Sequence, residues 1–408
     1  MLSAVPNRSP ASFGCRTRLP GCDIGTFRLP ERHRIVTTPK IGFACAWDRP
    51  PQGTWSHTPW NLRAALRERT AVVDLGLEWS LPVRSALRGL GAHRHEGRWG
   101  SHWKHLPLTM ALAGTKLRAA ERKLRPDVVL QIGDLARTDT PFLLYQDSSF
   151  DILLERLDTE SGRALHFPGL DRAALGRLRD RQHRIYREAA GLLTMSQWLA
   201  DHLVRVSGVP RDKVHVVPPA ANGLPDGPVA RCHEGPRRRL LFVGKDFSTK
   251  AGDVVVKALA VLRAESDPEL TLTVVGPKEW PLPGPVPAGV EFLGRIPVEQ
   301  VRMLYRTHDL FVMPSRFEGY GIALVEALAH GLPCVARRDC AMPEIVRAGE
   351  NGDLIDSDDP RELAGVIAGL LADDGVYERV LATAPQVIGR HSWGRVADDV
   401  LRVAATVR

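Results

Sequence analysis

The chain has 408 residues, of which 44% are hydrophobic and 25% are charged, and its formal net charge is +8 at pH 7. This ordinary globular composition excludes a disordered or fibrous chain, and the length predicts about two domains. No apolar run approaches the roughly 20 residues that a membrane-spanning helix needs, and residues 1–39 contain Pro, Arg and Gly instead of the apolar segment of a signal peptide. We therefore expect a cytoplasmic protein in which residues 1–39 form a flexible basic leader.

Positive charge is concentrated near the start of the chain. Residues 1–130 carry 21 Lys or Arg against 9 Asp or Glu, whereas the remaining 278 residues carry 34 against 38. A basic N-terminal domain favours an anionic partner, such as an acidic acceptor or the inner face of a membrane, where the protein would be peripheral. The alternative is a solvated face that binds nothing.

The elements predicted up to residue 219 alternate between short apolar runs and helical patterns. Alternation of this kind is typical of a parallel sheet covered by helices. A long basic region that ends at Arg125 is expected to be helical. The apolar runs are 40–47, 70–78, 126–133, 141–149 and 213–219.

The segment 220–236 concentrates Gly, Pro and small residues and is the best candidate for a linker. The strand–helix alternation starts again after it. We therefore predict two Rossmann-like α/β domains, at 40–222 and 223–388, whose parallel sheets face a central cleft. A last helix, 389–408, should return to the N-terminal domain.

The stretch "DLFVMPSRFEGYGIALVEALAHG" (309–331) predicts a strand, a loop and a helix in succession. The helix should run from Ile322 to His330 and end at Gly331. The first N–H groups of a helix have no partner within it, so they suit an anion such as a diphosphate. Here they belong to Ile322, Ala323 and Leu324.

Two carboxylates flank this predicted anion site. Glu318 precedes the helix, and Glu326 lies about one turn inside it, so each can hold a different hydroxyl-bearing group, as the sugar and ribose of a nucleotide sugar require. Gly319 and Gly321 allow the backbone to approach closely, and one of them is expected to have a positive φ. The alternative is that Glu318 only caps the helix and Glu326 is an exposed carboxylate.

Two other phosphate-binding motifs are excluded. No Lys follows the glycines as the Walker pattern demands, and a dinucleotide fingerprint would need Gly or Ala where Leu324 stands.

The segment 314–336 resembles the Glu-x7-Glu signature of the retaining GT-B glycosyltransferases of the group 1 and family 4 type, which include sucrose, glycogen and mannosyl transferases. The similarity extends over most of 40–408. "LLFVGKDFSTKAGDVVVKAL" (240–259) is similar to the family's donor loop, and "PEIVRAGENG" (343–352) also fits. The resemblance implies the GT-B fold, a nucleotide-diphosphate sugar as donor, and neither a metal nor another cofactor.

The resemblance also implies roles for residues of the C-terminal domain. Lys245 and Lys250 would pair with the donor diphosphate, where positive charge stabilises the departing nucleotide; otherwise they are solvated loop lysines. Glu318 would contact the transferred sugar and Glu326 the ribose, while Arg295 falls where the family's backbone touches the base. Backbone groups of Gly321, Ile322 and Ala323 would bind sugar and phosphates.

In the N-terminal domain, "QGTWSHTPWNL" is similar to the glycine-bearing first loop of one branch of the family. Gly53 would let the backbone approach the donor, and His57 contacts the acceptor or only fills space. Gln146 stands where the family's strand ends in His, so a side-chain base is either Asp147 or absent. Retaining members of this fold are thought to use the leaving phosphate to deprotonate the acceptor, which tolerates that loss.

A cluster of basic and aromatic residues occupies 93–105. It lacks a convincing ligand set for a metal ion. It would dock an acidic acceptor or an anionic membrane, or else it is a solvated face.

We therefore predict a metal-independent retaining hexosyltransferase of glycan biosynthesis, with a glycan, lipid-linked or small-molecule acceptor and no nucleic-acid partner. The alternatives are a nucleotide-sugar epimerase or hydrolase and a non-catalytic binding subunit, which Gln146 favours. The predicted catalytic residues are Glu318, Lys245, Lys250 and Asp147. The predicted donor-binding residues are Glu326, Gly319, Gly321, Ile322, Ala323, Leu324, Arg295 and Gly53.

Overall fold

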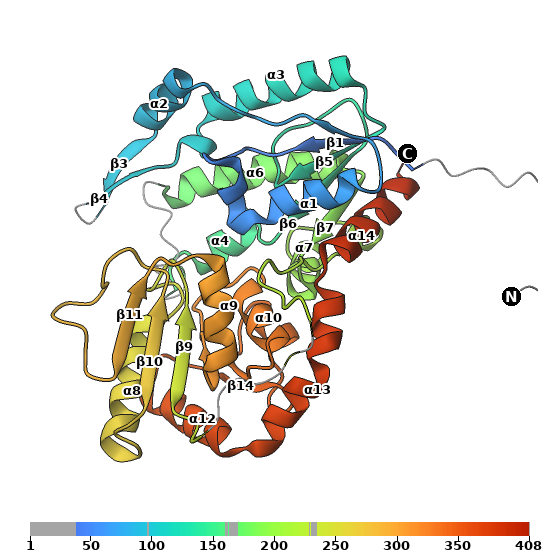
Figure 1. Ribbon diagram of the computed structural model, residues 1–408. Helices are drawn as coiled ribbons and strands as arrows, with labels where there is room; N and C mark the ends of the chain where they lie inside the picture. The colour runs from blue at the N-terminus through green and yellow to red at the C-terminus, as the bar shows by residue number, and fades with distance from the viewer. Residues whose placement is uncertain are drawn as a thin grey trace, which may run out of the picture. The chain divides into compact units, whose positions relative to one another are not determined.

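Two parallel six-stranded sheets form the framework of the protein, as a computed structural model shows (Figure 1). The structure describes residues 38–407 apart from 96–97, 160–161, 163–169, 228 and 230–234. The predicted leader therefore lies outside the described residues, except for its last two. Residues 38–408 make up one compact unit that contains both sheets, and the predicted domain boundaries stay predictions.

The first sheet has the strand order β2-β1-β5-β6-β7-β8, and every pairing in it is parallel. Its central strands β5 and β6 are buried at every position because helices cover both faces. Its strands are β1 Ile41–Ala44, β2 Val72–Asp74, β5 Val128–Ile132, β6 Phe142–Gln146, β7 Gly191–Thr194 and β8 Val214–Val216.

Helices cover the first sheet on two sides. The apolar stripe of α1, which includes Leu62 and Leu66, packs with Ile41 and Phe43 of β1, whereas α3, α6 and α7 pack in a separate cluster on the other face. The helices are α1 Thr58–Arg67, α2 Leu81–Leu90, α3 Pro107–Leu124, α4 Phe150–Arg156, α6 Arg172–Glu188 and α7 Gln197–Arg205, with short 3-10 helices at Pro51–His57, Trp103–His105 and Arg211–Lys213.

The second sheet has the order β11-β10-β9-β12-β13-β14, again with only parallel pairings. In Figure 1, α9 and α10 lie on one face, and α8 packs against β10 and α12 on the other. Its strands are β9 Arg239–Val243, β10 Thr271–Val275, β11 Val290–Gly294, β12 Leu310–Val312, β13 Cys334–Arg337 and β14 Gly352–Ile355. The helices are α8 Gly252–Glu265, α9 Val298–Thr307, α10 Ile322–Ala329, α11 Met342–Ile345, α12 Pro360–Ala372, α13 Asp374–Arg390 and α14 Trp393–Thr406.

One predicted helical region is wrong in part. Between α2 and α3 the chain forms an antiparallel hairpin of β3 (Ala92–His95) and β4 (Arg98–Ser101). These four-residue strands contain His, Arg and Gly and have no apolar alternation, so nothing in the local pattern distinguishes them from a basic helix.

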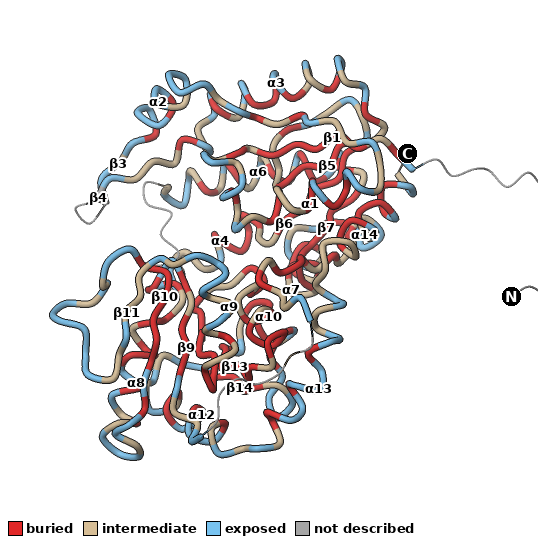
Figure 2. The backbone as a smooth tube through the Cα atoms, in the orientation of Figure 1, coloured by how far each residue is buried: buried red, intermediate tan, exposed pale blue. Residues whose placement is uncertain are grey.

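The last helix, α14, packs against α1 of the first sheet. Arg69 Nε donates to Asp398 Oδ1 at 2.6 Å, and Val396 and Val400 of α14 are fully buried. Figure 2 shows that buried residues follow the inner strands of both sheets, whereas the edge strands β2 and β11 contain none. Among the described helices, none is both long and apolar enough to span a bilayer.

We predict that Leu66→Ala lowers the free energy of unfolding by about 3 kcal/mol, because Leu66 of α1 is fully buried in the apolar cluster that contains Ile41 and Phe43 of β1. Leu90→Ala is the matched control, since Leu90 is also helical but 66% exposed, and it should change stability by less than about 0.5 kcal/mol. Urea denaturation measures both values. Equal effects of the two substitutions would contradict the packing described.

Candidate functional site

The candidate site lies where the strand order of the second sheet reverses. Strands β9 and β12 are neighbours, but the chain leaves β9 toward β10 on one side and leaves β12 toward β13 on the other. The loops 244–251 and 313–321 therefore diverge at the carboxyl ends of these strands. Crevices of this kind bind ligands in open α/β sheets.

An ion pair joins the two loops. Lys250 Nζ donates to Glu318 Oε2, and the two side chains are only 22% and 14% exposed. Ser315 Oγ also donates to Glu318 Oε2, at 3.4 Å. A Cβ atom on Gly244 would lie 2.8 Å from Lys250 Cγ, so glycine is needed for the lysine stem to pass. The structure brings Lys250 and Glu318 together, while Lys245 is exposed on the same loop.

The start of α10 presents backbone N–H groups beside this ion pair. Gly321 has φ +113°, which confirms the positive φ predicted for one of the two glycines. Within the described residues, the N–H groups of Ile322 and Ala323 have no backbone acceptor. The Leu324 N–H, however, donates to Gly321 O at 3.0 Å. The prediction that Leu324 offers a free N–H is therefore wrong, because an i to i+3 hydrogen bond to the Gly321 carbonyl closes the first turn of the helix.

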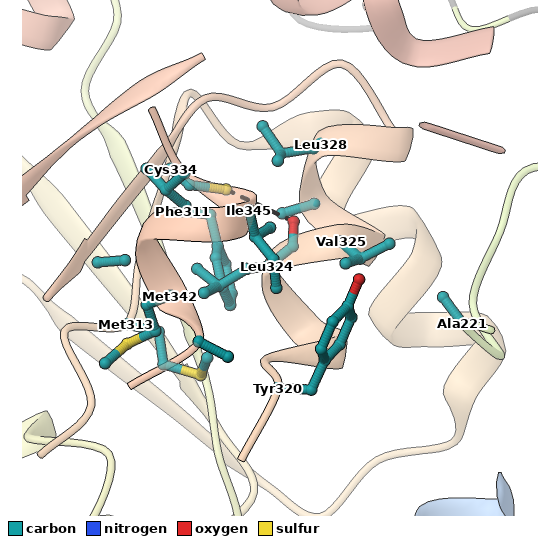
Figure 3. Packing of buried hydrophobic residues seen from close by; sticks show 14 of the residues in the cluster. Ala221, Phe311, Met313, Tyr320, Leu324, Val325, Leu328, Cys334, Met342 and Ile345 are labelled. Carbon is teal, nitrogen blue, oxygen red and sulfur yellow. Dashed lines mark hydrogen bonds between the residues drawn. The ribbon is translucent and has the colours of Figure 1, made fainter. Parts of the chain in front are cut away.

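Apolar packing holds α10 in this position. Figure 3 shows Leu324, Val325 and Leu328 within a buried cluster that also contains Phe311 of β12 and Met342 of α11. The three helical residues are at most 3% exposed. This packing fixes α10 on its buried side and holds its N-terminus beside the ion pair.

Glu326 is bound to the chain segment that links the two sheets. Its Oε1 accepts from the N–H groups of Asn222 and Gly223 at 3.2 and 2.9 Å, and its Oε2 accepts from Tyr305 Oη at 3.3 Å. Burial raises the pKa of Glu326 above its ordinary value, and the two backbone donors oppose that shift. Asn222 was not predicted as a partner of Glu326, because the two residues are 104 positions apart in the sequence.

Asp147 of the first sheet lies close to the loop that carries Glu318. It follows β6, and a Cβ on Gly319 would lie 2.8 Å from Asp147 Oδ2, so glycine permits this close approach. Burial raises the pKa of Asp147 to about 6; the charge of Glu318 adds to the rise, and hydrogen bonds from its own backbone and from the Trp55 side chain oppose it. The structure thus groups Asp147 with Glu318 and Lys250. Trp55 was not predicted as part of this group.

The remaining predicted residues lie around this group. Gln146 is buried and donates from Nε2 to Tyr186 Oη at 2.7 Å. Arg295 is exposed, and its Nε donates to Gly276 O at 3.3 Å. Gly53 is exposed two residues before Trp55, and a Cβ there would meet no atom within 4 Å. The ligand contacts predicted for Arg295 and Gly53 stay predictions.

Two family models match separate parts of the chain. The model described as Glycosyltransferase Family 4 matches residues 58–222, and the model described as Glycosyl transferases group 1 matches residues 237–373. The D-inositol 3-phosphate glycosyltransferase of Rhodococcus jostii is 31% identical over 241 residues, which are 54% of this chain and 53% of that protein. The chain thus spans about half the length of the curated relatives that it matches.

Solved structures share the whole arrangement at low identity. A sucrose-phosphate synthase from Thermosynechococcus elongatus aligns with a TM-score of 0.64 and 18% identity over 88% of this chain and 97% of that one. Anabaena HepE, solved in complex with UDP and glucose, aligns with a TM-score of 0.57 and 14% identity over 89% and 98%. The chain has the GT-B glycosyltransferase fold. The predicted fold class and the predicted likeness to group 1 and family 4 glycosyltransferases are confirmed.

Within this GT-B framework, the basic residues at 93–105 lie on and beside the β3–β4 hairpin. His93 and His102 stack with their ring centroids 5.3 Å apart, and Trp99 is 76% exposed. In the part of the chain that the structure describes, no group of three or more His, Cys, Asp or Glu is placed to hold a metal ion. Contact of this surface with an anionic membrane stays a prediction.

We expect the raised pKa of Asp147 to appear in the pH dependence of stability. Between pH 4 and about pH 6 the folded chain keeps a proton that the unfolded chain has released, so the contribution of Asp147 to stability falls as the pH rises. The free energy of unfolding of the wild type minus that of Asp147→Asn should therefore fall by up to about 3 kcal/mol from pH 4 to pH 7. Urea denaturation at each pH measures this difference. A difference that is constant or rises with pH would contradict the assignment.

Proposed function

We propose that this protein is a retaining glycosyltransferase that moves a hexosyl unit from a nucleotide-diphosphate sugar to a hydroxyl group of an acceptor. The observation that carries the proposal is the Lys250–Glu318 ion pair at the strand reversal of the second sheet, beside the free N–H groups of α10. Cations, amides and a carboxylate in one crevice suit a ligand with an anionic diphosphate next to a sugar.

The diphosphate would lie between the loop after β9 and the start of α10. Lys250 would interact with the phosphates as well as with Glu318. Lys245, which is exposed on the same loop, would add a second positive charge. Negative charge on the diphosphate grows as the sugar leaves, so fixed cations stabilise the transition state more than the bound donor. The two lysines supply this charge without a metal ion.

The transferred sugar would lie between Glu318 and Asp147. The bond from the anomeric carbon to the diphosphate breaks, the acceptor oxygen forms a new bond to that carbon on the same face, and the acceptor proton passes to the departing phosphate oxygen. Asp147, whose pKa burial raises to about 6, would hold the acceptor hydroxyl. Gln146 carries no charge and takes no proton.

One solved neighbour supports the donor assignment, and the name of one curated relative concerns the acceptor. HepE holds UDP and glucose in its crystal structure, and the curated relative from Rhodococcus jostii is named for transfer to an inositol phosphate. We extend the nucleotide-sugar donor to this chain on the strength of the crevice. The acceptor does not follow from either relative.

A binding protein without transfer activity is the second candidate. It is favoured by Gln146, whose amide is held by Tyr186 at the position where the family resemblance expects His. Such a protein would bind the donor and form no glycoside. A nucleotide-sugar hydrolase would instead release nucleoside diphosphate and free sugar.

We expect UDP or GDP to raise the thermal unfolding temperature, because a ligand at 100 times its Kd stabilises a fold by about 2.7 kcal/mol. Lys250→Ala should weaken the nucleoside diphosphate by roughly tenfold to a hundredfold, since a charge-assisted contact is lost. Lys257→Ala, on an exposed position of α8, is the control and should leave affinity unchanged. Equal affinity of wild type and Lys250→Ala would place the diphosphate elsewhere.

Glu318→Ala should lower transfer by roughly a hundredfold or more, because the sugar loses the group that orients it. Glu299→Ala, exposed on α9, should retain wild-type transfer. Chromatography of the products with a panel of nucleotide sugars separates glycoside from free sugar. Undiminished transfer by Glu318→Ala would refute the site, and free sugar as the only product would favour the hydrolase.

A further inference from the structure

A cavity of about 350 Å³ opens at the carboxyl ends of β1, β5 and β6. The first sheet reverses its strand order between β1 and β5, since the chain leaves β1 toward β2 on one side and leaves β5 toward β6 on the other. The cavity therefore lies in the crevice at the strand reversal of the first sheet. The Lys250–Glu318 ion pair lies in the corresponding crevice of the second sheet. Asp147 lines the cavity and also faces Gly319 of the second sheet.

The walls of this cavity are mainly apolar and aromatic. Trp55, Trp79 and Trp103 line it together with Phe150 and Met110. Cavities of this size with aromatic walls bind compact ring systems, which bury their faces against the indoles.

Three side-chain oxygen atoms of residues that line the cavity lack hydrogen-bond partners. Among the described residues, Thr109 Oγ1, Gln146 Oε1 and Ser148 Oγ have none, and Thr109 and Gln146 are each 4% exposed. An unpartnered buried polar atom costs free energy. Each of these atoms is closed to a water molecule, so a ligand hydroxyl group would pair with it only after a small side-chain movement. The cavity thus has apolar walls with unpartnered polar atoms directly behind them.

The charged groups of the cavity already have partners. Lys104 Nζ donates to Asp48 Oδ1 at 2.8 Å, and Arg181 Nη1 donates to Asp134 Oδ2 at 2.9 Å. His105 is uncharged at neutral pH because burial lowers its pKa to about 4. A phosphate or carboxylate would therefore find no unpaired cation among the described residues that line this cavity.

We propose that this cavity binds the acceptor, and that the acceptor is a neutral, compact, ring-containing alcohol or phenol whose hydroxyl group points toward Asp147. The proposal rests on the proposed transfer function and adds the chemical class of the second substrate. An uncharged ring fills the aromatic walls, and its hydroxyl group reaches the side chain that faces the predicted sugar site.

An anionic acceptor would need a different surface. A neighbouring groove of about 570 Å³ is lined by Arg118, Arg177 and Arg184 and shares His105 and Arg181 with the cavity. The residues that line this groove do not include Asp147, Gln146 or Trp55. A phosphate held in this groove would therefore not contact Asp147.

Isothermal titration calorimetry with 2-naphthol, a neutral two-ring phenol, tests the proposal on the full chain. Wild type should bind 2-naphthol, and Ala113→Phe, which fills the cavity from α3, should bind it at least tenfold more weakly. Thr109→Val keeps the shape and removes one unpartnered hydroxyl group, so it should weaken 2-naphthol severalfold while the chain folds normally. Should Ala113→Phe fail to fold, Thr109→Val decides. Arg184→Ala, in the arginine groove, is the control and should bind 2-naphthol as wild type does.

Three results would overturn the proposal: no binding of 2-naphthol to wild type, equal binding to wild type and the cavity variants, or tighter binding of myo-inositol 1-phosphate that Arg184→Ala weakens. Titration of UDP and GDP on the same samples separates the two hypotheses. Nucleoside diphosphate binding without 2-naphthol binding refutes the acceptor class alone. Binding of 2-naphthol without either nucleotide refutes the donor site alone.

Discussion

The ion pair between Lys250 and Glu318 depends on the adjacency of β9 and β12, and the candidate site depends on that ion pair. Its partners are 68 positions apart and come from loops that leave neighbouring strands in opposite directions. Only that divergence leaves space between the loops. Gly244 and Gly321 then remove the side chains that would obstruct the lysine stem and the start of α10.

The same site also needs the first sheet, because Asp147 completes it from β6. Two charged contacts between elements that flank the two sheets contribute to this arrangement. Glu344 of α11 accepts from the N–H groups of Gln197 and Trp198 at 2.9 and 2.6 Å, which caps α7 with a negative charge. Arg156 of α4 donates two hydrogen bonds to Asp339 at 2.7 and 2.6 Å. Charged contacts of this kind are directional, so they orient one sheet relative to the other more strictly than apolar packing alone.

Each sheet thus presents a crevice of different chemistry at its own strand reversal. The second sheet offers cations, backbone N–H groups and a carboxylate, whereas the first offers aromatic walls whose charges are neutralised by partners. Asp147 belongs to both crevices. This difference is what the proposed binding of a highly charged donor and an uncharged acceptor close to the same carboxylate requires.

Local sequence determined most strands and helices, because buried parallel strands are short apolar runs and α10 carries its apolar stripe and stop glycine within one segment. It also determined that Glu318 and Glu326 flank the start of α10, since both lie on one continuous stretch. The β3–β4 hairpin was not predicted, because its strands lack apolar alternation. The hydrogen bond from the Leu324 N–H to Gly321 O was not predicted either, because residue types do not specify the hydrogen bonds of a turn. Only the tertiary structure decided that Lys250 meets Glu318, that Asp147 faces Gly319 and that residues of several loops and helices line one aromatic cavity. These contacts join distant residues, so they follow from strand order and packing, which no local pattern encodes.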